Sequence, residues 1–253
     1  MRDVLGIAQA NRHTADRIAV ALLASDPRFG RTADGRWTVA ATAAESPNLD
    51  SCRFAVVDVE TTGCRAFKGD RVIEIAVVWL DGTVAFHSLI NPGIPIPAFV
   101  QGLTGIAPAT LLNAPSFDAV VDDLLHVLSG CVFVAHNARF DWAFISAEIQ
   151  RTRGLVLQGP RVCTLRLARR LLPDLPRRNL DSVSYHFGIE IEGRHRAVGD
   201  AVAAARVLHR LVRMAREQGA VTLGDLQDVR RAACGVAMED RSPHATRPTP
   251  HVP

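Results

Sequence analysis

Three strand-forming segments lie close together between residues 54 and 90, and they constrain the fold of this chain more than any other feature. Residues 54–58 form a short apolar run, and residues 71–80 are rich in β-branched side chains. The segment 83–90 follows directly after Asp81-Gly82, a dipeptide that favours a tight hairpin turn. Because so short a connection joins antiparallel neighbours, we expect an antiparallel meander.

The chain that follows is mainly helical by the spacing of its apolar residues. Residues 91–97 contain three prolines and are expected to form a loop. A further apolar strand is predicted over residues 131–135. The predicted helices cover residues 117–129, 139–152, 164–172, 180–187 and 198–216. A meander followed by helix, strand and further helices predicts an α/β architecture with a mixed sheet.

Residues 1–50 precede this α/β domain as an N-terminal extension. They contain a predicted helix over 14–25 and a predicted hairpin over 28–39, centred on Asp34-Gly35. The rest, residues 40–50, is small and polar and is expected to be a linker. A helix followed by a short basic hairpin resembles the end of a winged helix. The extension is therefore either a packed addition to the domain or a DNA-binding element.

The α/β domain itself is expected to span residues 51–216. The remaining residues, 217–253, form a C-terminal extension that ends in a stretch with several prolines and charged residues. Such a composition at a chain terminus predicts a disordered end.

Composition limits the function only loosely. A net charge of +3 and an isoelectric point near 8.8 fit a nucleic-acid-binding protein without requiring one. The five cysteines include no C-x-x-C pair, which argues against a disulfide framework or a structural zinc site and favours a reducing compartment. No apolar run reaches the length of a membrane span, and residues 1–17 lack the apolar core of a signal peptide. We therefore expect a cytoplasmic protein with no membrane partner.

Two acidic residues, Asp58 and Glu60, lie at the end of the first predicted strand. Residues two apart in a strand point to the same side, so their carboxylates are expected to emerge together. Like charges that close repel, and each is costly to bury. A divalent cation relieves both penalties, and oxygen ligands suit Mg²⁺ or Mn²⁺. The following Thr61-Thr62-Gly63 turn offers backbone amides to a phosphate or a sugar.

Two more clusters lie at the starts of predicted helices. In residues 136–141 (HNARFD), Asp141 falls in the first helical turn, where the helix dipole favours a carboxylate, and Asn137 is a candidate N-terminal cap. In the third cluster, His195 lies just before a helix and Asp200 at its start, so both can face one site. Taken singly, each of these residues can be purely structural. Together, in order and at element ends, the clusters predict one catalytic site.

The combined pattern resembles the DEDDh 3′–5′ exonucleases, whose members include the proofreading (epsilon) subunit of bacterial DNA polymerase III. The resemblance covers about residues 54–214. It is carried by Asp58-x-Glu60 with Thr61-Thr62-Gly63, His136-Asn137-x-x-Phe140-Asp141, His195-x-x-x-x-Asp200 and the loop Leu103-Thr104-Gly105-Ile106. It implies a ribonuclease H-like fold with a central mixed five-stranded sheet flanked by helices. One departure is Gly199, which we expect to loosen its helix by up to about 1 kcal/mol without affecting catalysis.

The resemblance also implies a role for each reactive residue. Two divalent ions, Mg²⁺ or Mn²⁺, are expected as cofactors. Asp58, Glu60 and Asp200 would hold the first ion, and Asp58 with Asp141, partly through water, would hold the second. His195 would be the general base that takes a proton from the attacking water at neutral pH.

Contacts with the 3′-terminal nucleotide are implied as well. Leu103 would wedge against the last base, and Phe140 would support its sugar or base. Thr61 would bind the terminal 3′-hydroxyl through its backbone. Arg178, in a loop before a helix, is either a ligand of the next phosphate or part of a solvated basic turn. The expected substrate-binding residues are Thr61, Leu103, Thr104, Asn137, Phe140 and Arg178.

The function predicted from the sequence is that of a 3′–5′ exonuclease, a hydrolase. It would release nucleoside 5′-monophosphates from single-stranded or frayed DNA 3′ ends, in proofreading or in repair, with a DNA polymerase as a candidate partner. An exonuclease directed at RNA is the first alternative, because the metal chemistry would be the same. A catalytically silent module that binds a polymerase is the second, although such a module would normally have lost one or more of the carboxylates.

Overall fold

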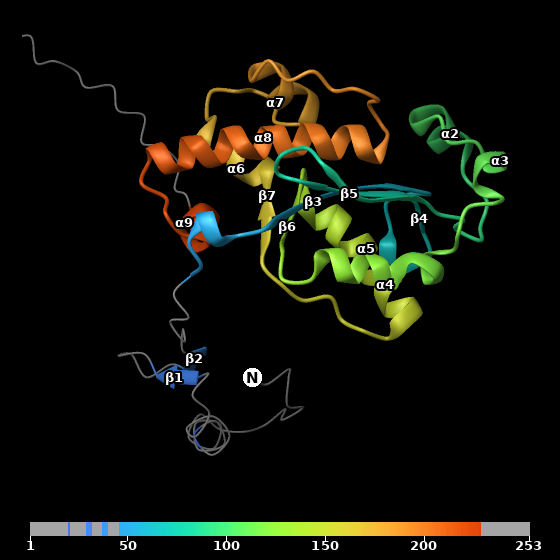
Figure 1. Cartoon of the computed structure of the whole chain (residues 1–253), viewed down its shortest axis with the longest axis horizontal. Helices are drawn as coiled ribbons and strands as arrows, with labels where there is room; N and C mark the ends of the chain where they lie inside the picture. The colour runs from blue at the N-terminus through green and yellow to red at the C-terminus, as the bar shows by residue number, and fades with distance from the viewer. Residues whose placement is uncertain (1–19, 21–28, 32–36, 40–45, 229–253) are drawn as a thin grey trace, which may run out of the picture. The chain divides into compact units, whose positions relative to one another are not determined.

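The structure, a computed structural model, describes residues 20, 29–31, 37–39 and 46–228 (Figure 1). By its internal contacts the chain divides into two compact units: Met1–Ser51 with Thr222–Gly224, and Cys52–Val221 with Asp225–Pro253. The predicted helix over 14–25, apart from Val20, and the predicted disordered end lie outside the described residues.

The first unit contains the predicted hairpin. Strands β1 (Phe29–Arg31) and β2 (Trp37–Val39) pair antiparallel, with Phe29 opposite Val39, so the hairpin around Asp34-Gly35 is confirmed. The end of the predicted linker forms a short 3₁₀ helix, η1 (Leu49–Ser51). In the same unit an isolated antiparallel bridge joins Asn48 to Thr222.

A five-stranded mixed sheet forms the centre of the second unit. Its strands are β3 (Phe54–Thr61), β4 (Val72–Trp79), β5 (Val84–Leu89), β6 (Val132–Ala135) and β7 (Arg161–Cys163). The order across the sheet is β5-β4-β3-β6-β7. Strands β3, β4 and β5 pair antiparallel, as the meander predicted, whereas β6 and β7 add in parallel to β3. The mixed five-stranded sheet is therefore confirmed.

Helices cover both faces of this sheet (Figure 1). One face packs against α4 (Phe117–Leu128) and α5 (Ala138–Arg153), with Val57 and Ile75 in the same apolar cluster as Leu124 and Ile145. The other face carries α8 (Ala197–Glu217), which contacts both β3 and β4, together with α6 (Thr164–Leu171) and α7 (Leu180–His186). All five helices predicted from apolar spacing are present, each within two residues of its expected bounds.

Alanines form much of the buried face of α8. Ala201, Ala204 and Ala205 are buried along with Leu208, at positions that repeat every three or four residues. Small side chains let a helix axis approach a sheet closely. The start of α8 is therefore held near the strand that carries Asp58 and Glu60.

Several short elements were not predicted. They are η2 (Ala66–Lys68), α2 (Ala98–Thr104), α3 (Pro108–Leu111), α9 (Leu223–Asp228) and the three-residue strand β7. Helix α2 corrects the expectation that Leu103 and Thr104 lie in a loop: both are in its last turn, and Gly105 ends the helix in the left-handed conformation. Within the described part of the chain, every helix is too short or too polar to cross a membrane.

The close approach of α8 predicts the effect of a larger side chain. Ala204→Leu should lower the free energy of unfolding by roughly 1–3 kcal/mol, because the added atoms push α8 away from its packing partners. Arg206→Leu, on the exposed side of the same helix, should change it by less than about 0.5 kcal/mol. Urea unfolding measures both values. Equal effects would show that α8 is not tightly packed there.

Candidate active site

The carboxylates of Asp58 and Glu60 lie on the face of β3 that α8 covers. Their neighbours Val57 and Val59 belong to the cluster beneath α4 and α5, and alternate residues of a strand face opposite sides. The predicted strand ended at Asp58, but β3 continues to Thr61, so both acids lie within the strand. Glu60 pairs directly opposite Glu74 on β4. The prediction that the two carboxylates emerge together is thus confirmed.

Asp200 joins them from the first turn of α8. Asp58, Glu60 and Asp200 each offer a carboxylate oxygen, and these atoms all lie within 4.8 Å of one another. Residues from strand β3 and from helix α8, far apart in the sequence, therefore form one acidic cluster. Three oxygen donors at this spacing are compatible with a single bound cation.

Asp141 lies in the first turn of α5 and is buried. It is not one of the three acids grouped within 4.8 Å, but its charge raises the pKa of Asp58. Burial raises the pKa of Asp141 to about 8, against the opposing effect of backbone hydrogen bonds that include the amide of Val59. The charge of Glu60 contributes to this rise, although less than burial does. The fourth predicted acid is thus close enough to couple with the cluster.

Arg194, which pairs with Asp200, only partly offsets the effects of burial and crowding on the cluster acids. Burial, followed by the charges of Asp141, Asp200 and Glu60, raises the pKa of Asp58 well above its usual value. Burial and neighbouring acids also raise the pKa of Glu60 to about 7. The Oδ1 atom of Asp200 is buried and has no hydrogen-bond partner among the described residues. An unpartnered buried oxygen beside crowded carboxylates fits a divalent cation.

Glu74 provides a contrast within the same site. It is fully buried, yet Arg196 binds it in bidentate fashion, with both N–O distances 2.9 Å. The Ala197 amide donates to it at 3.1 Å and His87 bonds it at 2.9 Å. Burial opposes ionisation, but these bonds outweigh it and lower the pKa of Glu74. The charge of Glu74 is therefore compensated by its hydrogen bonds, and Glu74 anchors the start of α8. The carboxylates of the acidic cluster lack such compensation.

His195 lies one residue before Arg196, the partner of Glu74. It is half-buried and adopts the left-handed backbone conformation, with φ of 62°. Its amide donates to Asp200 Oδ2 at 3.3 Å, so the predicted base and the predicted ligand are in direct contact. Arg194, on the other side, also binds Asp200 and is held by Asp181 at 2.6 and 3.1 Å. Sequence reasoning missed Arg194, Arg196 and Glu74, although a glutamate within an apolar strand signals a buried ion pair.

Gly199 has a different role from the one expected. A Cβ atom there would lie 1.9 Å from the Glu192 carbonyl oxygen and 2.6 Å from that of Gly193. The loop before α8 passes directly over the first turn of the helix, and only glycine leaves room for it. The expectation that Gly199 merely loosens the helix was wrong, because the residue allows the loop with His195 to pack beside Asp200.

Three of the predicted substrate contacts, Leu103, Thr104 and Thr61, lie on α2 and at the end of β3. Helix α2 packs through Val100 onto Ile73, the neighbour of Glu74, and Leu103 is half-exposed in the last turn. Thr104 is buried, and its hydroxyl bonds the Val100 carbonyl oxygen at 2.9 Å. The hydroxyl of Thr61, in turn, donates to the Gly63 carbonyl oxygen at 2.6 Å.

The other predicted contacts surround the start of α5. Asn137 is exposed at the N-cap position with φ of 77°, and its side chain makes no capping bond, so it is free for another partner. Phe140 is half-buried and packs on Phe144 with ring centroids 4.9 Å apart. Arg178 is turned inward, where it donates to the carbonyl oxygens of Leu172, at 3.1 Å, and Pro173. Its role as a phosphate ligand stays a prediction.

His136, part of the second motif, links three segments. Its ring nitrogens bond the Thr164 hydroxyl and the Arg178 carbonyl oxygen, both at 2.9 Å. Burial lowers the pKa of His136 to about 4, so the ring is neutral at physiological pH. His136 thus ties β6 to the start of α6 and to the loop before α7.

The raised pKa values predict how stability depends on pH. Without divalent ions, stability should fall as the pH rises from about 5 to 8, because folded Glu60 and Asp141 keep protons that the unfolded chain releases near pH 4. Mn²⁺ requires ionised ligands, so its stabilising effect should grow over the same range. Melting temperatures in EDTA and in Mn²⁺ at several pH values measure this. An equal Mn²⁺ effect at pH 5 and pH 8 would contradict it.

The anchor predicts a coupled pair of substitutions. Arg196→Gln should cost roughly 3 kcal/mol of stability, because it leaves Glu74 buried without its main partner. It should also weaken Mn²⁺ binding, since the start of α8 carries Asp200. Adding Glu74→Gln should recover much of the stability. Chemical denaturation of the two single variants and the double variant tests this. Additive losses in the double variant would mean that the pair is not coupled.

Comparison with known proteins is consistent with this geometry. The model of the exonuclease (RNase T) family matches residues 55–208. The epsilon subunit of DNA polymerase III from Aquifex aeolicus is 34% identical over 168 residues, which are 65% of this chain and 83% of that protein. The 3′-5′ exonuclease DinG of Bacillus subtilis is 35% identical over 183 residues, 71% of this chain but 20% of that protein.

A solved structure shows the same fold. Exonuclease X, in complex with 5′ overhanging duplex DNA, superposes with a TM-score of 0.54 at 23% identity and covers 70% of this chain and 98% of the other. Most of the curated relatives are much longer proteins, of which this chain spans less than a third. Because the family model matches more than half of its residues, the chain belongs to the exonuclease family, with the ribonuclease H-like fold and epsilon-like sequence of its DEDDh members.

Proposed function

We propose that this chain is a metal-dependent 3′–5′ exonuclease that removes nucleoside 5′-monophosphates from single-stranded or frayed DNA ends. The observation that carries the proposal is the gathering of Asp58, Glu60 and Asp200 within 4.8 Å. The family match and the named 3′-5′ exonuclease among the relatives support the direction and the reaction. As in the sequence-based prediction, the domain is assigned to residues 51–216.

The four acids are assigned to two divalent ions, Mg²⁺ or Mn²⁺. Asp58, Glu60 and Asp200 would hold one, which the unpartnered Asp200 oxygen supports. Asp58 and Asp141 would hold the other, in keeping with their electrostatic coupling. When bound, such ions supply the Lewis acidity that activates water and stabilises the departing 3′ oxygen.

His195 is assigned as the general base. It would accept the proton of the attacking water as the phosphorus–oxygen bond forms, and the departing 3′ oxygen would gain a proton from solvent. The contact between its amide and Asp200, and the fixed backbone enforced by the Arg196–Glu74 pair, support this assignment. They fix the backbone of the half-buried His195 beside Asp200, and Arg194 contacts the Nδ1 atom of its ring at 3.2 Å.

Five residues are assigned to the terminal nucleotide. Leu103 and Phe140 would pack against its base and sugar, with Thr104 fixing the helix turn that presents Leu103. Asn137 would offer its free amide, and Thr61 its backbone. Arg178 could reach the next phosphate only by leaving the carbonyl oxygens that it now binds.

The cellular setting is part of the proposal. A DNA polymerase is proposed as a partner because one relative is a polymerase subunit by name. The cytoplasm is proposed as the location. The N-terminal extension is proposed to resemble part of a winged helix, of which the hairpin is described.

A digestion assay tests the activity. With Mg²⁺ or Mn²⁺, the protein should shorten a 5′-labelled single-stranded DNA from its 3′ end, and EDTA should stop it. Asp200→Asn should abolish cleavage because a cluster ligand is lost, and His195→Gln should reduce it at least about a hundredfold. Asp123→Asn, an exposed acid on α4, is the matched control and should cleave like the unmodified protein.

The same assay separates the alternatives. Faster digestion of a matched RNA strand would replace the DNA assignment by the RNA-directed one. Metal binding lost in His195→Gln would make His195 a ligand rather than the base. If neither nucleic acid is cut, the chain is a catalytically silent binding module and the proposal is wrong.

A further inference from the structure

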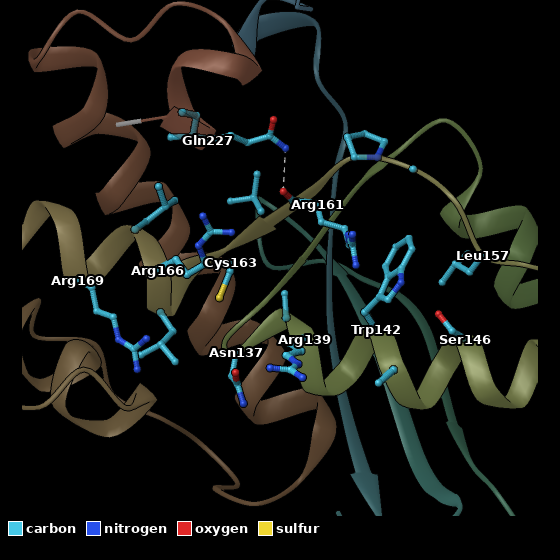
Figure 2. Close-up of a pocket in the computed structure, with 18 of the residues that line it drawn as sticks. Asn137, Arg139, Trp142, Ser146, Leu157, Arg161, Cys163, Arg166, Arg169 and Gln227 are labelled. Atoms are coloured by element: carbon cyan, nitrogen blue, oxygen red, sulfur yellow. Dashed lines mark hydrogen bonds between the residues drawn. The ribbon is translucent and has the colours of Figure 1, made fainter. Parts of the chain in front are cut away.

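A long groove runs beside α5, next to the candidate active site. It has a volume of about 1030 Å³ and lies between α5, β7 and α6 (Figure 2). A smaller hollow of about 410 Å³ adjoins it, between the start of α5 and the segment 64–68. The two share Phe67, Asn137, Arg139 and Ala143 in their walls, so they form one continuous groove.

Seven cationic side chains line this groove, which we call the basic groove. They are Arg65, Lys68, Arg139, Arg161, Arg166, Arg169 and Arg170. Asp228 is the one carboxylate in its walls. A surface with this imbalance attracts an extended polyanion.

These cations differ from several other arginines of the described chain in lacking an acidic partner. Arg71 pairs with Glu148, Arg153 with Asp118 and Asp122, and Arg196 with Glu74. By contrast, none of the seven groove cations forms an ion pair with a carboxylate of the described residues. Their charge is therefore available to a ligand.

The fold holds several of these guanidinium groups in place without neutralising them. Arg166, Arg169 and Arg170, at spacings of three and four residues, share one face of α6 (Figure 2 shows the first two). On the facing wall, the Arg161 guanidinium lies 4.5 Å from the centre of the Trp142 ring. A planar guanidinium held in this way suits the oxygens of a phosphate.

Phe67 adds an aromatic surface to the charges. Its side chain is 67% exposed, although it lies in the walls of both hollows. Bases stack on exposed aromatic rings in proteins that bind single strands, whereas an acidic peptide has no need of one. The combination of guanidinium groups and an exposed ring therefore favours a nucleic acid over an acidic protein segment.

The groove has the length of several nucleotides and ends near the reaction centre. Its wall on α5 extends from Ala138 to Gln150, roughly 18 Å at the helical rise, or about five nucleotides at the phosphate spacing of a stacked strand. It includes Phe140, the residue before Asp141, but none of the four acids. The groove thus begins at Asn137 and Phe140, which are assigned to the terminal nucleotide, and extends away from them along α5.

We propose that the basic groove binds the sugar–phosphate backbone of the strand whose 3′ end is at the acidic cluster, several nucleotides upstream of that end. This rests on the proposed function, which places the 3′ end there. The groove contributes affinity in proportion to the number of phosphates it contacts. A strand long enough to fill it binds more tightly than a short one, whatever its sequence.

Binding without cleavage tests the groove. In EDTA, fluorescence anisotropy measures the affinity for labelled oligothymidylates of about 4 and about 20 nucleotides at several salt concentrations. Arg166→Gln with Arg169→Gln should weaken binding of the longer strand roughly tenfold at low salt. The slope of log affinity against log salt should become shallower by about 1.4, the loss of two phosphate contacts on a single strand. The shorter strand should change less than about twofold, because it does not fill the groove.

The matched control is Arg206→Gln with Arg210→Gln on the exposed side of α8. It removes the same charge outside the groove and should bind both strands like the unmodified protein. If the two double variants bind equally, whether both are weakened or neither is, the proposed role of the basic groove is wrong. Absence of cleavage in Mg²⁺ together with length-dependent binding that the groove variant loses would overturn the proposed reaction alone. If the unmodified protein cleaves DNA and the groove variant binds the longer strand as tightly, only the proposed role of the basic groove is wrong.

Discussion

The mutual repulsion of carboxylates gathered under the first turn of α8 is the constraint around which this domain is organised. Asp58 and Glu60 leave β3 on the face that α8 covers, and Asp200 meets them from that helix. Burial raises the pKa of each acid, and neighbouring carboxylates raise the pKa values of Asp58 and Glu60 further. A fold that holds such a cluster must supply other interactions to keep it together, or a cation from outside.

The protein provides part of that compensation itself. The Arg194 guanidinium opposes the rise in the pKa of Asp58, Glu60 and Asp200, and Asp181 fixes it in place. The pKa values stay raised all the same, because burial outweighs Arg194 and, at Glu60, Arg196 as well. Glu74 shows what full compensation looks like, since its bonds to Arg196, His87 and the Ala197 amide bring its pKa below the usual value. Glu74 and Glu60 lie opposite each other on neighbouring strands, yet their pKa values shift in opposite directions. Glu74 supports the fold, whereas Glu60 belongs to the acids that suit a bound cation.

The sequence was informative where structure is local. Period-two alternation placed Asp58 and Glu60 on one side, and apolar spacing located the helices that carry Asp141 and Asp200. It was uninformative where the signal is short or distant. Strand β7 has three residues, of which only Val162 is buried, so no pattern can develop. The Arg196–Glu74 pair joins residues 122 apart, and the loop contact that requires Gly199 exists only in the folded chain. For the same reason the inward turn of Arg178 could not be read from its position in a basic turn.

Net charge conceals the distribution that matters. A value of +3 for the whole chain is nearly neutral, and it gave little reason to expect a polyanion as ligand. In the folded domain some charged side chains form ion pairs and others do not. Buried acids such as Glu74 and Glu148 pair with arginines, so the charges of Arg196 and Arg71 are balanced within the fold. The groove cations keep their charge because no acid is placed beside them, and the acidic cluster keeps its own because the arginines near it are too few. A surface that attracts phosphates therefore lies beside a centre that attracts metal ions, and the two are complementary because a phosphodiester and its activating cations have opposite charges.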